Sequence, residues 1–231
     1  MSETRTTTSQ NADARRDILS SIRQSLAAST PFDAEWRTHH EHSSESVAEQ
    51  DLVTSTISRS SLVEDFQKSL EMVGGHCAIV SDENKAAEEI RNVISTLAAS
   101  RIAISDSELI KRLVDRNGKN EVVENAPAAY LFDCDLGITS AQLAIAETGT
   151  LVLESDKESH RLTSLVPPVH LCVIKADNIR QTLGEILEIT SRDLSRTITF
   201  ITGASRTSDI ELTLAIGVHG PGELHVIVIA D

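Results

Sequence analysis

Residues 76–105 read HCAIVSDENKAAEEIRNVISTLAASRIAIS and contain the pattern on which the fold depends. Short apolar runs at 76–80 and 101–105 are typical of buried strands. Between them, from Glu83 to Ala99, apolar side chains recur every three or four residues, which is typical of an amphipathic helix. This stretch therefore predicts a strand, a helix and a second strand in that order.

Similar segments follow on both sides of this stretch. Upstream, apolar residues at helical spacing run from Leu62 to Val73, and Gly74-Gly75 ends that predicted helix. Downstream, a further helix is predicted from Ser107 to about Arg116. Strands are predicted at AAYLF (128–132), TLVLE (150–154), VHLCVI (169–174), TITFI (197–201) and HVIVI (225–229), with helical segments at TSAQLAI (139–145) and near 177–190.

Unbroken apolar runs suit strands that are covered on both faces, so we expect a three-layer α/β domain with a mainly parallel sheet over residues 51–231. Ligands of open α/β sheets bind beyond the carboxyl ends of the strands, which directs attention to the loops after TITFI and around TLVLE. The first 50 residues are predicted to hold a disordered start, an amphipathic helix over 13–28 and a polar linker over 31–50.

Charge and composition disfavour several classes of partner. The chain of 231 residues carries 21 Lys and Arg against 35 Asp and Glu, a formal net charge of −14, and its aromatic content is 3%. Duplex nucleic acid and anionic lipid require concentrated positive charge, and single-stranded nucleic acid requires aromatic stacking, so no nucleic acid or lipid partner is expected. No run of about 18 apolar residues suggests a membrane span, and the polar first residues do not resemble a signal peptide, so a cytoplasmic protein is predicted.

The three cysteines, Cys77, Cys134 and Cys172, are scattered and form no C-x-x-C pair. A zinc finger or an iron–sulfur cluster needs about four closely organised ligands, so we expect no metal site and no resident cofactor. Cys77 and Cys172 lie in apolar runs and are predicted to be small buried side chains.

Glu147-Thr148-Gly149-Thr150, which leads into the strand 150–154, is the first of three segments with the residue types of a binding site. Gly149 permits close approach of a ligand to the backbone, and the hydroxyl groups of Thr148 and Thr150 can contact it. Glu147 is a candidate catalytic base or nucleophile. An ordinary glycine turn before a strand explains the same residues, and the spacing alone does not decide between the two.

The second segment starts at Gly203, directly after the strand 197–201, and includes the candidate ligand contacts Ser205, Arg206, Thr207 and Asp209. A glycine turn followed by the start of a helix would gather free backbone N–H groups, which together with the helix dipole favour an anion. The guanidinium group of Arg206 would add a forked, charged donor for a carboxylate or phosphate.

This second segment also has a purely structural interpretation. Ser208 and Glu211 have the spacing of a capping box, which would complete a helix N-terminus without any ligand. Glu211 is therefore interpreted as a cap, whereas Arg206 is interpreted as a ligand contact.

The third segment, residues 217–222, contains three glycines, a proline and His219. An imidazole can act as acid, base or donor near neutral pH, so His219 is the second candidate catalytic residue, and Gly220 beside it is a candidate ligand contact. A single histidine is more often structural, and that alternative stays open. None of the three segments matches a P-loop or a dinucleotide-binding fingerprint.

The ordered set AETGTLVLES (146–155), RLTSLVPPVHLCVI (161–174) and GASRTSDIELTLAIGVHGPGELHVIVI (203–229) resembles the lactate utilization protein C family, also called the LUD domain. The resemblance covers roughly residues 52–231, and the helix DARRDILSSIRQSL (13–26) is also similar to the family's N-terminal helix. Ala204 stands where the family usually has proline, which affects the rigidity of the turn before Ser205.

The resemblance implies a fold similar to that of ribose-phosphate isomerase, glucosamine-phosphate deaminase and the CoA transferases. It also implies a role in oxidising L-lactate to pyruvate together with iron–sulfur partner proteins. Two hypotheses stay open: a subunit of such a system that binds a small anion, or a free-standing enzyme on phosphorylated or CoA-linked substrates with Glu147 as nucleophile or base. A fold alone does not decide whether the chain is an enzyme.

Overall fold

The computed structural model describes the chain as two units, Met1–Ser55 and Thr56–Asp231. In the first unit, the described residues 16, 18–21 and 23–24 are helical and fall within the helix predicted over 13–28. The predicted domain boundary after residue 50 lies outside the described residues and stays a prediction. In the second unit, the structure describes residues 58–116, 118–158, 161–208, 214–217 and 219–230.

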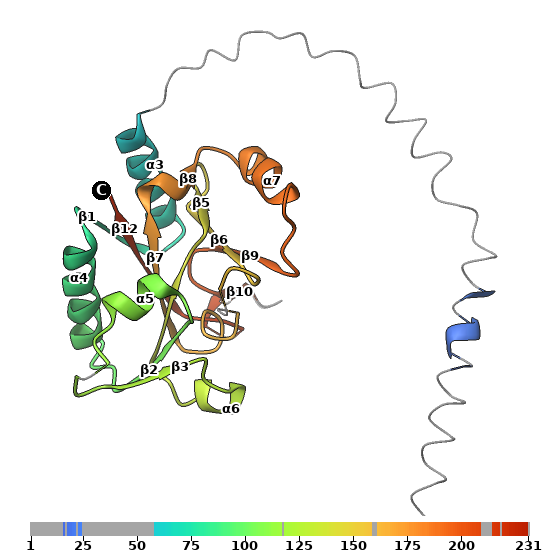
Figure 1. Cartoon of the computed structure of the whole chain (residues 1–231), viewed down its shortest axis with the longest axis horizontal. Coiled ribbons are helices and arrows are strands. Elements are labelled where there is room, and N and C mark those ends of the chain that lie inside the picture. The colour runs from blue at the N-terminus through green and yellow to red at the C-terminus, as the bar shows by residue number, and fades with distance from the viewer. Residues whose placement is uncertain are drawn as a thin grey trace, which may run out of the picture. The chain divides into compact units, whose positions relative to one another are not determined.

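A six-stranded sheet forms the centre of the second unit (Figure 1). Its strand order is β1-β12-β7-β4-β2-β3, and every neighbouring pair is parallel. Burial on both faces explains the unbroken apolar runs, and the five residues of β4 are all buried. The strands are β1 (His76–Val80), β2 (Arg101–Ile104), β3 (Glu121–Glu124), β4 (Leu136–Ser140), β7 (Val169–Lys175) and β12 (Glu223–Ile229).

Helices α4 (Glu83–Thr96) and α5 (Glu108–Leu113) cover one face of this sheet. Helix α4 begins where the side chain of Asp82 accepts a hydrogen bond from the N–H of Lys85. The apolar stripe of α4, which includes Ile90, packs together with α5 against β2, β4, β7 and β12. The strand–helix–strand prediction for residues 76–105 is therefore confirmed.

The opposite face of the six-stranded sheet packs against helix α3 (Arg59–Met72) and a second sheet. The second sheet has four strands in the order β8-β5-β6-β9, and β6 is antiparallel to both β5 and β9. Leu70 of α3, Leu151 of β6 and Val226 of β12 belong to one buried core. The strands are β5 (Leu143–Ile145), β6 (Thr150–Glu154), β8 (Ile179–Arg180) and β9 (Ile198–Thr202).

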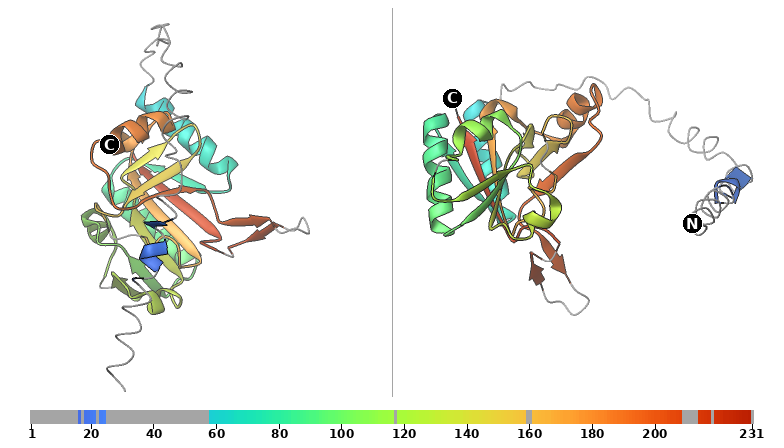
Figure 2. Two further views of the ribbon diagram at one scale, coloured as in Figure 1. Left: turned by 90° about the vertical axis from the view of Figure 1, so that its right-hand side faces the viewer. Right: turned by 60° about the horizontal axis from the view of Figure 1, so that its bottom comes forward.

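Further elements cover or extend this frame. Helix α7 (Leu183–Ser191) packs on the second sheet, where its Ile186 shares a small core with Val152. Strands β10 (Arg206–Ser208) and β11 (Leu214–Ile216) form an antiparallel ribbon that extends away from both sheets (Figure 2). The short helices α6 (Ala128–Leu131) and η2 (Ala176–Asn178) lie in connections. A mainly parallel sheet flanked by helices confirms the predicted α/β class. The second sheet, in which β5 pairs parallel with β8 and antiparallel with β6, was not predicted.

Two segments adopt the opposite structure from the one that their sequences predict. The segment 139–145 is not helical, because it ends β4 and forms β5, whose three residues are all buried. The segment 128–132 is not a strand, because Pro127 precedes the short helix α6. A short apolar run fits a buried strand or a buried helix equally well, and its partners in the tertiary structure decide between them.

The last turn of α3 is closed by backbone hydrogen bonds, as the Gly74-Gly75 pair predicts. The N–H of Gly75 donates to the carbonyl of Leu70 at 2.9 Å, and the N–H of Gly74 donates to that of Glu71 at 3.0 Å. This turn lies so close to the loops before β6 and after β9 that each loop has no room for a side chain at its glycine, Gly149 or Gly203.

Two glycines make this contact possible. Gly149 has a φ of +64°, and a Cβ atom there would overlap the backbone nitrogen of Leu70. Gly203 has a φ of +77°, and a Cβ atom there would overlap the carbonyl oxygen of Val73. Both glycines of the candidate site are therefore required by the packing of α3, whatever else they contact.

We expect Gly149→Ala to lower the free energy of unfolding by about 2–4 kcal/mol, because the methyl group would overlap α3 in a left-handed backbone conformation. Urea unfolding measures this loss. Gly184→Ala is the control, because a Cβ atom at Gly184 meets nothing closer than 3.7 Å and alanine favours its helix. Equal losses in the two variants would contradict the proposed role of Gly149.

Candidate functional site

A cavity of about 230 Å³ lies between β9 and the amino ends of β7 and β12. Strand β9 pairs antiparallel with β6 in the second sheet. The expectation of a site beyond the carboxyl ends of parallel strands therefore does not hold for the loop that follows β9. The cavity is lined by Ser164, Leu165, His170, Thr199, Phe200, Ile201, Thr202, Gly203, Ala204, Ser205, His219, Gly220, Pro221 and Leu224.

The second and third candidate segments meet at this cavity. The N–H of Ser205 donates to the carbonyl of Pro221 at 2.8 Å, and the N–H of Gly217 donates to the carbonyl of Ser205 at 3.0 Å. These bonds hold the loop after β9 against the loop before β12. The candidate residues that line the cavity are Gly203, Ser205, His219 and Gly220.

His170 is a buried lining residue that sequence reasoning missed. Only 1% of its surface is exposed, and its Nε2 atom hydrogen-bonds with the hydroxyl of Thr139 at 2.9 Å. Cys172, two residues further along β7, is fully buried, and burial raises the pKa of its thiol. The run VHLCVI predicts a strand. The one feature of the sequence that could have pointed to His170 as a site residue is that it is polar within this apolar run.

A second cavity of about 650 Å³ shares part of its lining with the first. Its charged lining residues are Asp133 and Asp135. The carboxylate of Asp135 accepts the backbone N–H groups of Arg101 and Ser100, and these bonds lower its pKa. This larger cavity is therefore acidic. The residues common to both cavities are Leu165, His219 and Gly220.

Glu147, the candidate base or nucleophile, is not among the residues that line these two cavities. Its carboxylate accepts the N–H of Leu183 at 3.0 Å, in the first turn of α7. Its own N–H donates to the carbonyl of Gln181 at 3.2 Å. Glu147 thus connects the first segment to the start of α7, where a negative charge is favourable, and a catalytic role for it stays a prediction.

Thr148 and Thr150 belong to a chain of hydroxyl groups that reaches the 230 Å³ cavity. The Oγ1 atoms of Thr148 and Thr150 lie 2.7 Å apart, and those of Thr150 and Thr202 lie 2.8 Å apart. Thr202 lines the cavity, and the antiparallel pairing of β6 with β9 places it opposite Thr150. Gly149, between the two threonines, contacts α3 instead.

Residues 206–208 form a strand and not the first turn of a helix. Residues 209–213, where the capping box of Ser208 and Glu211 would start a helix, lie outside the described residues. The Nη2 atom of Arg206 donates to the carbonyl of Val73 at 2.9 Å, at the C-terminal end of α3. A cation is favourable there because the helix dipole is negative at that end. Arg206 therefore holds α3, and its contact with an anion stays a prediction. The side chain of Thr207, together with Asp209 and Glu211, lies outside the described residues.

Glu158 is a buried carboxylate outside the three segments, at the carboxyl end of β4. It is 3% exposed and accepts hydrogen bonds from the Ser140 N–H at 2.9 Å, from the Ser140 hydroxyl, and from Gln142 Nε2 at 3.0 Å. Burial raises the pKa of Glu158, and the hydrogen bonds from Ser140 and Gln142 offset part of that effect. Sequence reasoning missed it because the polar stretch DKESHR resembles an ordinary loop.

No three His, Cys, Asp or Glu side chains in the described part of the chain lie close enough together to hold a metal ion. The three cysteines are free, and burial, aided by the charge of Glu71, raises the pKa of Cys77 to about 12. No helix in the described ranges combines the length and the hydropathy that crossing a membrane requires.

The sequence profile of the LUD domain matches residues 63–229, which include all three candidate segments. The chain belongs to the LUD domain family. The resemblance predicted from the ordered motifs is therefore confirmed. This LUD-domain protein is 29% identical to the Lactate utilization protein C of Deinococcus radiodurans over 229 residues, which cover 97% of this chain and 99% of that protein.

Two further relatives match the LUD-domain protein over shorter ranges. The Lactate utilization protein C of Bacillus subtilis is 32% identical over 103 residues, which cover 42% of this chain and 43% of that protein. An uncharacterized protein of Neisseria meningitidis is 31% identical over 143 residues, or 61% of either chain. These matches span less than two thirds of the two relatives.

The fold of the LUD-domain protein is similar to that of a crystal structure of a DUF162 family protein from Deinococcus radiodurans. The TM-score is 0.59 at 24% identity, and the likeness covers 75% of this chain and 99% of that chain.

We expect Arg206→Ala to lower the free energy of unfolding by about 1 kcal/mol, because the carbonyl of Val73 loses a charged donor. Arg206→Lys should lose less, since it keeps the charge without the forked geometry. Arg196→Ala is the control in urea unfolding, because Arg196 makes an exposed ion pair with Asp156 that contributes little. An unchanged stability of Arg206→Ala would contradict its role at α3.

Ionisation of Glu158 should lower the free energy of unfolding of the protein as pH rises. Glutamate titrates near about 4.3 in an unfolded chain, whereas burial raises the pKa of Glu158 in the folded state. The folded state therefore binds the proton more tightly between these two pKa values, and the free energy of unfolding falls as pH rises through this window.

The comparison of the natural protein with Glu158→Gln isolates this titration. The stability of the natural protein relative to the variant should decline from pH of about 4.3 up to the raised folded pKa, and be constant beyond it. Urea unfolding at a series of pH values measures the difference. A relative stability that is flat or rises with pH would show that the bonds from Ser140 and Gln142 outweigh burial.

Proposed function

We propose that this LUD-domain protein is a component of an L-lactate utilization system that oxidises lactate to pyruvate together with iron–sulfur partner proteins. The observation that carries the proposal is the match over 97% of the chain to a protein named Lactate utilization protein C. Three cysteines without a C-x-x-C pair support assigning the iron–sulfur clusters to partners.

The proposed ligand is a small hydroxy or keto carboxylate in the 230 Å³ cavity. This volume is below the range of about 300–1,000 Å³ found for sites of drug-sized ligands, so it suits a three-carbon acid better than a nucleotide. The hydroxyl groups of Thr202 and Ser205 and the imidazole of His219 can donate hydrogen bonds to a carboxylate. Since the described lining includes neither Lys nor Arg, these donors would carry the recognition.

The alternative is a free-standing enzyme on phosphorylated or CoA-linked substrates. It requires Glu147 as nucleophile or base, but the Glu147 carboxylate is bonded to the N–H of Leu183 and lies outside the lining of the cavity. It also requires room for phosphate groups, and the adjoining 650 Å³ cavity presents Asp133 and Asp135, whose charge would repel them. The geometry therefore favours the lactate system.

Deletion of the gene tests the role in the cell. The deletion strain should grow poorly on L-lactate and normally on pyruvate, and the affinity-tagged chain should copurify with proteins that contain iron–sulfur clusters. Normal growth of the deletion strain on L-lactate would contradict the proposal.

Calorimetric titration with L-lactate and with pyruvate tests the cavity. His219→Ala should weaken binding roughly three- to tenfold, because it removes a hydrogen bond of about 0.5–1.5 kcal/mol. His76→Ala is the matched control, because His76 is exposed and does not line the cavity. Equal effects of the two variants, or tighter binding of CoA than of lactate, would overturn the proposed ligand.

A further inference from the structure

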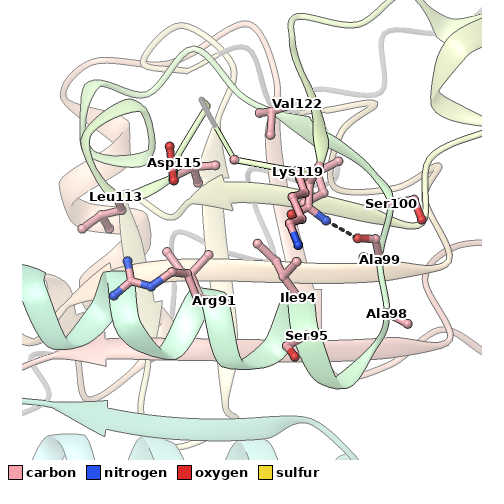
Figure 3. A pocket seen from close by; sticks show the side chains of 15 residues that line it. Arg91, Ile94, Ser95, Ala98, Ala99, Ser100, Leu113, Asp115, Lys119 and Val122 are labelled. Carbon is pink, nitrogen blue, oxygen red and sulfur yellow. Dashed lines mark hydrogen bonds between the residues drawn. The ribbon is translucent and has the colours of Figure 1, made fainter.

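A separate cavity of about 580 Å³ lies between the C-terminal ends of α4 and α5 and the amino ends of β2 and β3 (Figure 3). It is on the other face of the six-stranded sheet from the 230 Å³ cavity. Its lining includes Ile90 and Leu113, from the core on the α4 side, whereas the 230 Å³ cavity is lined by Ile201 and Leu224, from the core on the α3 side. An inference about this cavity is therefore independent of the proposed function.

The backbone groups around this cavity already have partners within the protein. The N–H groups of Ala98 and Ala99 donate to the carbonyls of Ser95 and Ile94, both at 3.1 Å, and Asn120 Nδ2 donates to the carbonyl of Ala99. A ligand would therefore find its polar partners among the side chains of the rim. The apolar lining consists of Ile90, Ile94, Ile102, Leu113, Val114 and Val122, with Ala98 and Ala99.

Two cations at the rim, Arg91 and Lys119, form no salt bridge with a described residue, although the charge of Arg91 helps to lower the pKa of Glu88 on the same helix. Other Lys and Arg side chains of the second unit pair with carboxylates or, like Arg206, with backbone carbonyls. Within the described ranges, the exceptions are Lys68, Arg91, Lys119 and Arg161. Two of these four side chains line one cavity. Figure 3 shows Lys119 extending from its loop toward Ile94 on α4, while the guanidinium group of Arg91 points the other way, toward Leu113.

We propose that this cavity binds a small organic anion with an apolar body, of the class of a medium-chain carboxylate. Lys119 contacts the anionic group, Arg91 attracts it from farther along the rim, and the chain covers the apolar lining. The lining carries these two cations against one carboxylate, Asp115, in a chain whose net charge is −14. Both parts of the ligand are needed, because exposed charges alone attract weakly and buried methylene groups add affinity.

Octanoate is the probe, titrated into the full chain and followed by ¹H–¹⁵N NMR. We expect shifts of the backbone amides of Ser95, Ala98, Lys119 and Val122, with weaker shifts from equal concentrations of acetate, which lacks the chain, and of octanol, which lacks the charge. Binding of acetate as tight as that of octanoate, or an absence of shifts at these amides, would overturn the proposal.

Two pairs of substitutions separate a site from general charge attraction. Arg91→Gln with Lys119→Gln should weaken octanoate binding about tenfold. Lys68→Gln with Arg161→Gln removes the same charge from cations outside the cavity and should leave binding within about twofold. Equal weakening by both pairs would overturn the proposal.

A third variant tests the apolar part without altering charge. Ser95 is exposed on α4, and Ser95→Trp would fill the cavity while leaving both cations in place. It should abolish the octanoate shifts while the thermal midpoint stays that of the natural protein. Undiminished binding by this variant would show that the ligand lies elsewhere.

Discussion

The fold on the α3 side of the sheet depends on close packing against the last turn of α3, which leaves no room for side chains at two neighbouring loop positions. Its backbone fills the volume that side chains at Gly149 and Gly203 would need, and its final carbonyl is bonded by Arg206. Carbonyl groups at a helix end have no partners within the helix, so they must be satisfied from outside wherever water is scarce. Segments from three distant parts of the chain are thereby fixed to one point.

This constraint also determines where the 230 Å³ cavity forms. The loop after β9 cannot move without losing its contact with α3, and Ser205 in that loop is bonded to the loop that carries His219. The glycines and the arginine that resemble a ligand-binding motif are thus explained first by packing. This structural role is compatible with the proposed ligand-binding role, because a loop that is held rigidly can present Thr202 and Ser205 in one orientation.

The elements that can be predicted most clearly from the sequence are strands buried on both faces and a helix that ends at a glycine pair. Strands β7 and β12 leave unbroken apolar runs, and Gly74-Gly75 marks the end of α3, so each was predictable. The sequence does not indicate whether a strand pairs parallel or antiparallel with its neighbour. TLVLE and TITFI have the composition of parallel strands, yet they pair antiparallel in the second sheet because tertiary contacts decide the pairing.

Single buried polar residues were the features that the sequence predicted least well. His170 and Glu158 each stand alone in sequence, one in an apolar run and the other in a polar loop, and they gain partners only through folding. At Arg206, by contrast, the sequence predicted an arrangement that the described residues do not form. The sequence after Gly203 fits a helix start, but residues 206–208 pair with β11, so the expected cluster of free N–H groups does not form there.

The order of the strands has a consequence for how this protein folds during synthesis. Strand β12 is the last strand in chain order, yet it lies between β1 and β7 near the middle of the sheet. Until residues 223–229 have left the ribosome, β1 has no neighbour in this sheet and the apolar side of α3 lacks part of its cover. Such long-range pairing slows folding, and it leaves the nascent chain open to association with other chains until its final strand is inserted.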